Sequence, residues 1–322
     1  MLRGGITCFN DMYYFPEGAV EAAVEAGMRI AAGLIVLDSA TPYAADADAY
    51  LQKGLALRDA WLDHELAHFC LAPHAPYTVG DRALEKVVTY AAQLDLPVHM
   101  HIHETQDEIR AGQAKYGLRP LARLRALGLL GPGLVAVHGV HLNDEEIGWL
   151  AGHGCPLAHC PPSNLKLASG FAPVARLLAE GVNVGLGTDG AASNNRLDLF
   201  AEMRLAALLA KGASGDPAVL PAHQALELAT LSGARALGLE QRIGSLEVGK
   251  QADVVAVDLS AAATQPCYDP ISQLVYCAGR EQVRHVWVGG KPAVRDGATV
   301  NLDEAEILAR AHAWRGRIAA AS

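Results

Sequence analysis

The chain has 322 residues, of which 51% are hydrophobic and 19% are charged, and its formal net charge at pH 7 is −9. This length and apolar content suit one barrel-sized domain with a smaller appendage, and the negative charge argues against a nucleic-acid partner. No apolar run approaches the ~18 residues of a membrane span, the N-terminus lacks a signal-peptide pattern, and the six cysteines form no C-x-x-C pair. We therefore expect a cytoplasmic protein with reduced thiols and no membrane contact.

Short apolar runs of strand character alternate with longer helical patterns over most of the chain. The predicted strands are residues 5–9, 29–36, 67–72, 97–102, 134–138, 156–160 and 182–187. The predicted helices are residues 16–26, 45–61, 80–93, 105–114, 118–127, 144–151 and 174–179. This alternation predicts an α/β fold with a parallel sheet, and the apolar strands predict burial on both faces. Seven units in series favour a (β/α)8 barrel of the TIM type over a doubly wound sheet, and no G-x-G-x-x-G follows the first strand.

The pattern changes after residue 238. Residues 241–257, 283–288 and 291–294 are predicted to be turn-separated strands, and residues 302–320 a final helix. The expected domains are a barrel over 1–238, a portion of a β-sandwich over 239–300, and a helical end over 301–322. Residues 1–5 have the pattern of a last helical turn with a glycine C-cap.

Ionisable side chains stand at or just after the ends of four predicted strands: His74, His101, Glu104, His138 and Asp189. Strand ends of one polarity meet at the mouth of a parallel barrel, so these side chains can reach a common centre. Each alone also has a structural explanation, such as a solvent-facing or satisfied core histidine, or an Asp in an Asp-Gly turn. Their occurrence together favours a functional site.

This set of residues suits the chemistry of metal-assisted deamination. Imidazole and carboxylate ligands hold divalent metals, which lower the pKa of a bound water toward ~7. Glu104 can protonate a purine ring nitrogen while hydroxide attacks the adjacent carbon. Asp189 can contact the metal and carry the proton from water to the departing ammonia, and His138 can orient the hydroxide.

Five segments of the chain resemble the amidohydrolase superfamily, and within it the 5-methylthioadenosine/S-adenosylhomocysteine deaminases of the TRZ/ATZ group. They are PHAPY at 73–77, HIHET at 101–105, HGVHL at 138–142, HCPPSNLKL at 159–167 and GTDGAASNN at 187–195. The run GSLEVGKQAD at 244–253 resembles the returning sandwich strands of that family. The similarity extends from about residue 2 to about residue 297, and the order and spacing of the segments make it specific.

The resemblance implies the ligands of one divalent metal ion. His101 and Asp189 are metal ligands in this comparison, and zinc is the expected ion, although iron or manganese also suits such donors. Glu104 is then the ring-nitrogen acid, Asp189 the proton shuttle and His138 the group that assists the hydroxide.

The resemblance also implies a small nucleoside substrate. His74 is expected to contact its sugar or the sugar's substituent, and Ser193 to lie near the nucleoside, with Glu104 and Asp189 also binding it. His159 and Asn164 match positions in the wall of the site, and we assign no role to His103. At the level of the superfamily, the expected assembly is a homodimer or a higher homo-oligomer.

The chain departs from this family at its first barrel strand, where the family carries a His-x-His pair of metal ligands after half of a sandwich. The histidines at 99, 101 and 103 match the fifth strand instead. We therefore expect a barrel without its first strand, through a misassigned start or a real loss, with weak metal binding and impaired activity.

Two alternatives to the adenosine deaminase hypothesis stay open. One keeps the fold and changes the substrate to that of a guanine or cytosine deaminase or a triazine hydrolase. The other is a non-catalytic remnant that serves as a binding or oligomerisation module. The segments at 73–77 and 190–195 favour the adenosine group. The joint retention of four site residues argues against a remnant: His101, Glu104, His138 and Asp189.

Overall fold

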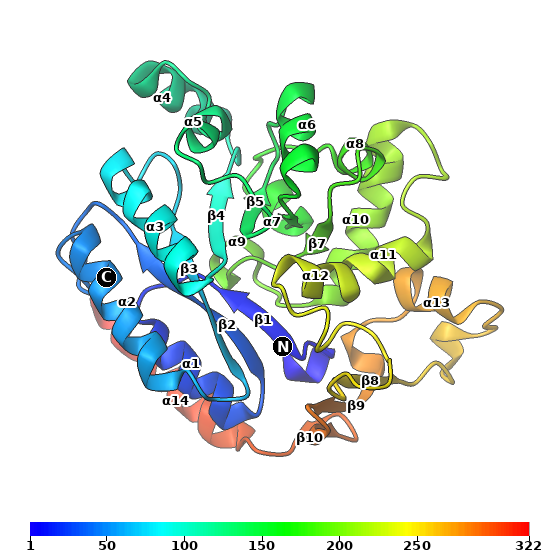
Figure 1. The fold of residues 1–322 in the computed structure, drawn as a ribbon. Coiled ribbons are helices and arrows are strands. Elements are labelled where there is room, and N and C mark those ends of the chain that lie inside the picture. The colour runs from blue at the N-terminus through cyan, green and yellow to red at the C-terminus, as the bar shows by residue number, and fades with distance from the viewer. Residues whose placement is uncertain (322) are drawn as a thin grey trace.

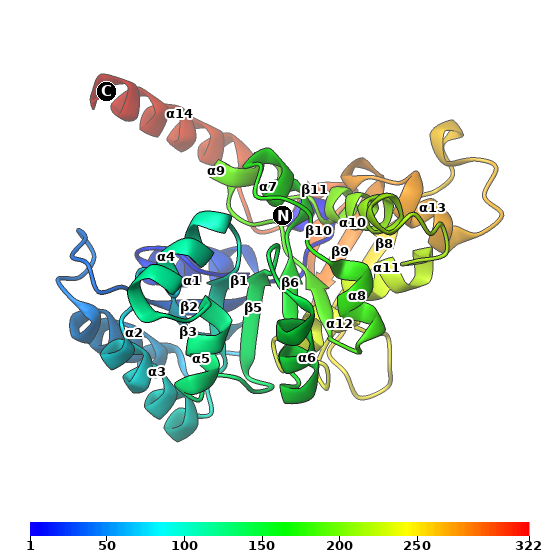
Figure 2. The same cartoon turned by 90° about the horizontal axis from the view of Figure 1, so that it is seen from above.

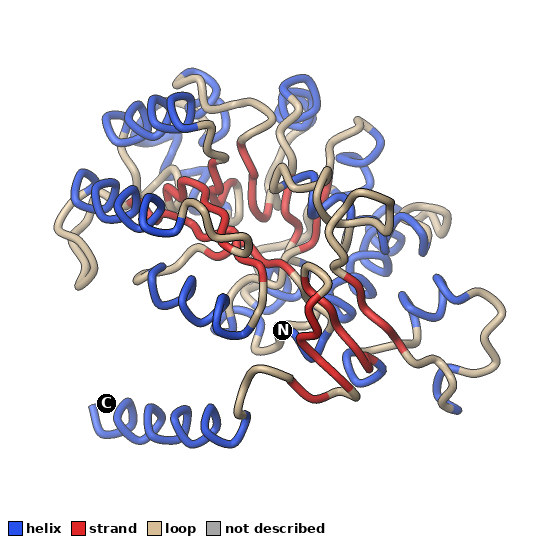
Figure 3. The backbone as a smooth tube through the Cα atoms, turned by 60° about the horizontal axis from the view of Figure 1, so that its bottom comes forward, coloured by secondary structure: helices blue, strands red, loops and turns tan. Residues whose placement is uncertain are grey.

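The structure, a computed structural model, describes residues 1–321. Its main sheet is parallel and each strand pairs with the next in sequence. The strands are β1 (Cys8–Asp11), β2 (Arg29–Val36), β3 (Ala67–Pro73), β4 (Val98–Ile102), β5 (Leu134–His138), β6 (Leu157–His159) and β7 (Val184–Leu186). All seven predicted barrel strands are therefore present, although the first begins later than predicted. The sheet curls, and helices lie along its outer side (Figures 1 and 3).

The helices also follow the predicted alternation. Up to β7 they are α1 (Pro16–Ala26), α2 (Ala47–Trp61), α3 (Asp81–Leu94), α4 (Gln106–Tyr116), α5 (Pro120–Ala126), α6 (Asp144–His153), α7 (Pro161–Lys166) and α8 (Val174–Ala179). Beyond it are α9 (Ala191–Asn194), α10 (Leu199–Ser214), α11 (Ala222–Leu228), α12 (Leu231–Ala236), α13 (Pro270–Tyr276) and α14 (Glu304–Ala321).

The core lies between the sheet and these helices. Every residue of β2 is buried, as expected for a parallel strand that is covered on both faces. The largest buried cluster joins strand residues such as Leu34, Leu71 and Met100 to helix residues such as Leu84 and Leu124. The carboxyl ends of the strands are thereby held in fixed positions relative to one another.

The first strand begins later than predicted. Residues 2–4 form a short 3-10 turn that ends at Gly5, whose φ of +83° favours glycine, as the C-cap pattern predicted. Ile6 is then buried against Met28 and residues of a second sheet. The chain pairs with β2 only from Cys8 onward, so the prediction of a strand over residues 5–9 was wrong at its start.

The second sheet is antiparallel, in the order β11 (Ala298–Thr299), β10 (Lys291–Arg295), β9 (Val283–Val288) and β8 (Val254–Val257). The predicted strands over 241–253 were wrong, because that segment forms turns. Ser245 and Lys250 are hydrogen-bonded to each other within it. The buried Arg29 of β2 forms an ion pair with Asp253 at 3.1 Å and anchors the segment to the main sheet.

Helix α14 extends away from the body of the molecule (Figure 2). Its residues 305–320 are all exposed, including Trp314 at 59% and Leu308 at 59%. No helix within residues 1–321 is long and apolar enough to cross a membrane. The proposed division at residues 238 and 300 stays a prediction.

Candidate active site

His101 lies on β4 with its ring oriented by the backbone. Its Nδ1 is 2.8 Å from the carbonyl oxygen of His74, which only accepts, so Nδ1 carries the hydrogen. Burial, helped by the imidazoles of His138 and His99, lowers the pKa of His101 to about 3. The ring is therefore neutral at pH 7, and Nε2 keeps its lone pair for a ligand.

His138 connects the predicted residues. It ends β5 and is 1% exposed, its ring stacks on that of His101 with centroids 5.4 Å apart, and its Nε2 lies 3.8 Å from Oε2 of Glu104. Its Nδ1 donates to Oδ1 of Asn164 at 2.8 Å. Gly139 follows with φ +56°, and a Cβ there would lie 2.4 Å from Leu157, so only glycine fits this turn.

Asp189 follows β7 and is held as an acceptor. Its Oδ2 accepts from the hydroxyls of Ser163 at 2.6 Å and Ser193 at 2.7 Å, and its Oδ1 accepts from the amide of Gly190 at 2.6 Å. Burial raises the pKa of Asp189, but these hydrogen bonds and the nearby His138 outweigh burial and leave that pKa below its usual value. Asp189 is thus ionised at neutral pH.

The other two residues expected to bind substrate, His74 and Ser193, lie near these groups. His74 follows β3, its Nδ1 is 3.0 Å from Oγ1 of Thr78, and its ring centroid is 5.0 Å from that of His101. Tyr77, half exposed, packs edge-on against His74. In this structure the hydroxyl of Ser193 donates to Asp189, so its expected contact with the nucleoside stays a prediction.

The donor set suits a divalent metal only in part. A neutral imidazole with an oriented Nδ1–H and an ionised carboxylate are the forms that bind metal, and His101 and Asp189 have them. Within residues 1–321, however, no group of three or more His, Cys, Asp or Glu side chains is arranged to hold an ion. The two residues therefore form a partial ligand set.

Some contacts of the site were missed in the sequence. Ser163 was not singled out, although it lies in the HCPPSN segment, and its hydroxyl reaches Asp189. His99 is buried beside His101 and its Nδ1 has no hydrogen-bond partner within the described residues. Glu202 of α10 accepts from Asn194, which also donates to the carbonyl of Thr188, directly before Asp189. No local pattern marks these residues, because their partners are distant in the chain or on another element.

A curled parallel sheet with histidines and carboxylates at the carboxyl ends of its strands is typical of barrel-type hydrolases. The chain belongs to the amidohydrolase family, whose model matches residues 1–293.

Individual relatives agree with this assignment. The chain is 48% identical over 320 residues to a 5-methylthioadenosine/S-adenosylhomocysteine deaminase of Teredinibacter turnerae, covering 99% of this chain and 72% of that protein. A protein of the same name from Moorella thermoacetica is 46% identical, with 96% of this chain and 72% of the relative covered.

Solved structures resemble the fold closely. An adenosine deaminase from Xanthomonas campestris with bound zinc superposes with a TM-score of 0.97 at 48% identity, covering 99% of this chain and 73% of that one. The atrazine chlorohydrolase of Arthrobacter aurescens, complexed with zinc, superposes with a TM-score of 0.91 at 27% identity. The match covers 97% of this chain and 73% of that one. The family resemblance and the α/β barrel-type fold expected from the sequence are confirmed.

Proposed function

We propose that this chain is a metal-dependent hydrolytic deaminase of 5′-methylthioadenosine, S-adenosylhomocysteine or a related adenosine. The observation that carries the proposal is the convergence of His101 and Glu104, from the end of β4, and Asp189, from the end of β7, on the buried His138 that ends β5. The deaminase names of relatives that are more than 40% identical over nearly the whole chain support the substrate class.

Each residue of the site has a separate role in the proposed reaction. Water adds to the ring carbon that bears the amino group, while Glu104 gives a proton to the adjacent ring nitrogen. Asp189 accepts one proton of the water and passes it to the amino group, which leaves as ammonia. The second proton of the water, on the new hydroxyl, returns to Glu104 as the carbonyl forms. His138, held through Nδ1 by Asn164, presents Nε2 to orient the water. The products are ammonia and the inosine-type nucleoside.

A metal ion fits this scheme with His101 and Asp189 as its protein ligands. When bound, such an ion supplies Lewis acidity that makes water a nucleophile near neutral pH. Zinc is the metal we propose, because a solved relative holds it. The orienting groups for these ligands are the His74 carbonyl, Ser163 and Ser193.

The test is ammonia release from a panel of substrates with zinc added. Methylthioadenosine, S-adenosylhomocysteine and adenosine are compared with guanine, cytosine and a triazine, since triazine hydrolases share the fold. We expect release from the adenosines only. The chain is assayed alone and with any in-frame sequence encoded before Met1. Absence of ammonia from every adenosine in both forms contradicts the proposal.

We further propose that the chain functions as a homodimer that pairs its α14 helices. Ile307, Ala311 and Trp314 follow the i, i+4, i+7 spacing of one helix face, and all are exposed. The helix is acidic at its start and carries Arg315 and Arg317 toward its end. An antiparallel pair would place opposite charges together across this apolar face.

A further inference from the structure

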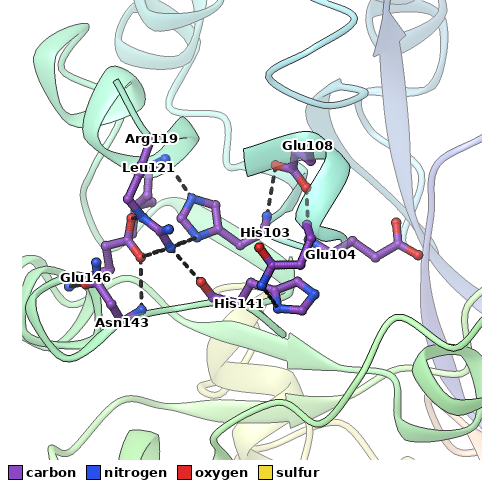
Figure 4. A network of polar contacts seen from close by, with 9 residues as sticks. His103, Glu104, Glu108, Arg119, Leu121, His141, Asn143 and Glu146 are labelled. Carbon is purple, nitrogen blue, oxygen red and sulfur yellow. Dashed lines mark hydrogen bonds and ion pairs between the residues drawn. The ribbon is translucent and has the colours of Figure 1, made fainter. Parts of the chain in front are cut away.

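One buried carboxylate holds two backbone amides in the turn between β4 and α4. Glu108, in the first turn of α4, accepts the N–H of His103 with Oε1 and the N–H of Glu104 with Oε2, each at 2.9 Å (Figure 4). Glu108 is 4% exposed. Thr105 caps the helix by accepting the N–H of Glu108 at 3.2 Å. The carboxylate therefore reaches past the cap to the two residues before it.

The segment that Glu108 holds is a left-handed turn. His103 has φ +56°, a conformation that residues with side chains adopt at a cost unless neighbouring contacts support it. The turn comes directly after β4, and it leads the side chain of Glu104 away from Glu108 (Figure 4) and to within 3.8 Å of His138. The direction of Glu104 thus depends on the geometry of this turn.

The ring of His103 fastens the same turn to α5. Its Nε2 accepts a hydrogen bond from the backbone N–H of Leu121 at 3.0 Å. The N-cap residue of α5, Arg119, makes no side-chain cap hydrogen bond, so the His103 ring satisfies one of the free N–H groups in the first turn of α5. The ring is 0% exposed, and its Nδ1 lies 3.4 Å from Oε2 of Glu146. A neutral His103 with its hydrogen on Nδ1 satisfies both contacts.

Glu146 connects a third helix, α6, to His103 and Arg119. It closes the capping box of α6 with Asn143, and Arg119 binds its carboxylate with two nitrogens at 2.7 and 2.8 Å. Arg119 also donates to the carbonyl of His141 at 2.6 Å. The first turns of α4, α5 and α6 therefore meet in one buried polar network behind Glu104 (Figure 4). Such a network gives the turn little freedom to relax.

We propose that Glu108 is a positioning residue for the reaction, which holds the 103–104 turn so that Glu104 faces the substrate's ring nitrogen. The inference rests on the proposed deaminase function for Glu104. Two acceptor oxygens are needed for two amides, and only a carboxylate at this place offers both. His103 supports the same turn from the side of α5.

The substitution that tests this is Glu108→Gln, because it keeps the side chain's size but replaces one acceptor with an N–H donor. We expect kcat to fall about 10- to 100-fold with KM changed less than about threefold, since misplacement of a reacting group costs rate rather than binding. We expect the amides of residues 103 and 104 to exchange faster with deuterium by at least about tenfold. Deuterium exchange is measured by mass spectrometry in the absence of substrate. The kinetic constants are measured with saturating zinc.

The matched control is Asp107→Asn, which removes a charge from the same helical turn. The side chain of Asp107 is 86% exposed and pairs only with Arg110 within the described residues. We expect its exchange and kinetics to match the parent chain. Glu108→Asp, whose shorter side chain cannot span both amides, replaces Glu108→Gln if the latter fails to fold.

A double variant separates positioning from general stabilisation. If Glu108 acts through Glu104, adding Glu108→Gln to Glu104→Gln lowers kcat no further than Glu104→Gln alone. Unchanged exchange at residues 103 and 104 in Glu108→Gln overturns the inference, whether or not the chain deaminates adenosines. Unchanged kcat in an active enzyme, or a multiplicative loss in the double variant, also overturns it. If no adenosine is deaminated but exchange at residues 103 and 104 is altered, the proposed function and the positioning role of Glu108 in it are rejected. The result would then show only that Glu108 holds the turn.

Discussion

The proposed acid, Glu104, is the residue whose loss separates catalysis from binding most clearly. It is partly exposed at the mouth, beside the buried His138, and it contributes no ligand to the proposed metal. We expect Glu104→Gln to lower kcat about 10²- to 10⁴-fold, the range for a lost general acid, with little change in zinc affinity. Steady-state ammonia release and zinc titration measure the two effects.

The matched control for this variant is Glu145→Gln, an exposed carboxylate in the first turn of α6. It makes the same chemical change away from the site, and its kcat should stay within about twofold of the parent. A Glu104→Gln variant that keeps its rate would remove Glu104 from the mechanism.

Single residues were predictable where the local pattern places them. His101, His138 and Asp189 stand at strand ends that the apolar runs define, so their meeting at one mouth follows from the alternation of strands and helices. The groups that orient them were not predictable. The contact of Ser163 with Asp189 depends on packing between α7 and the end of β7, which no spacing in the sequence encodes.

At the scale of elements, α10 carries a buried acid that makes stability depend on pH. Burial raises the pKa of Glu202 to about 9, despite the hydrogen bond from Asn194. In the unfolded chain this carboxyl titrates near its ordinary value of 4.5. Between these two pKa values the folded state holds a proton that the unfolded state has released, so rising pH destabilises the fold.

We therefore expect Glu202→Gln, which mimics the protonated acid, to remove this contribution. The parent chain should lose stability from about pH 5 to pH 9 with a slope of at most ~1.4 kcal/mol per pH unit from this group. The variant should show a flatter profile and higher stability at the alkaline end. Urea unfolding across this range measures both, and identical profiles would show that Glu202 is ionised in the folded protein.

Elements whose form is set locally were predicted well, and those set by distant contacts were not. The bounds of β2, β5, β9, α1 and α8 match their patterns because burial or capping continues to the last residue. Residues 241–253 have strand-like composition but form turns, since Arg29 fixes Asp253 from the main sheet. A partner more than 200 positions away cannot be read from a local pattern.

For the whole molecule, the number of metal ligands limits metal affinity. Residues 1–321 provide no cluster of three or more suitable side chains, whereas catalytic zinc sites usually have about three protein ligands. We expect the purified 322-residue chain to hold well below one zinc ion, and to lose it on dialysis. Elemental analysis and titration measure this, and a stoichiometric ion that survives dialysis would contradict it.

The exposed face of α14 leads to a prediction about assembly. An isolated helix of this length is marginal in water, so an 18-residue helix with an exposed tryptophan is best stabilised by a partner. With a chain mass of 33.9 kDa, we expect light scattering to report about twice that value for the parent chain. Trp314→Glu should be monomeric, because it places a charge at the centre of the apolar face. His312→Glu, which adds the same group two residues away on another face of the helix, should stay dimeric. A parent chain that is monomeric, or a Trp314→Glu variant that remains dimeric, would place the interface elsewhere or exclude it.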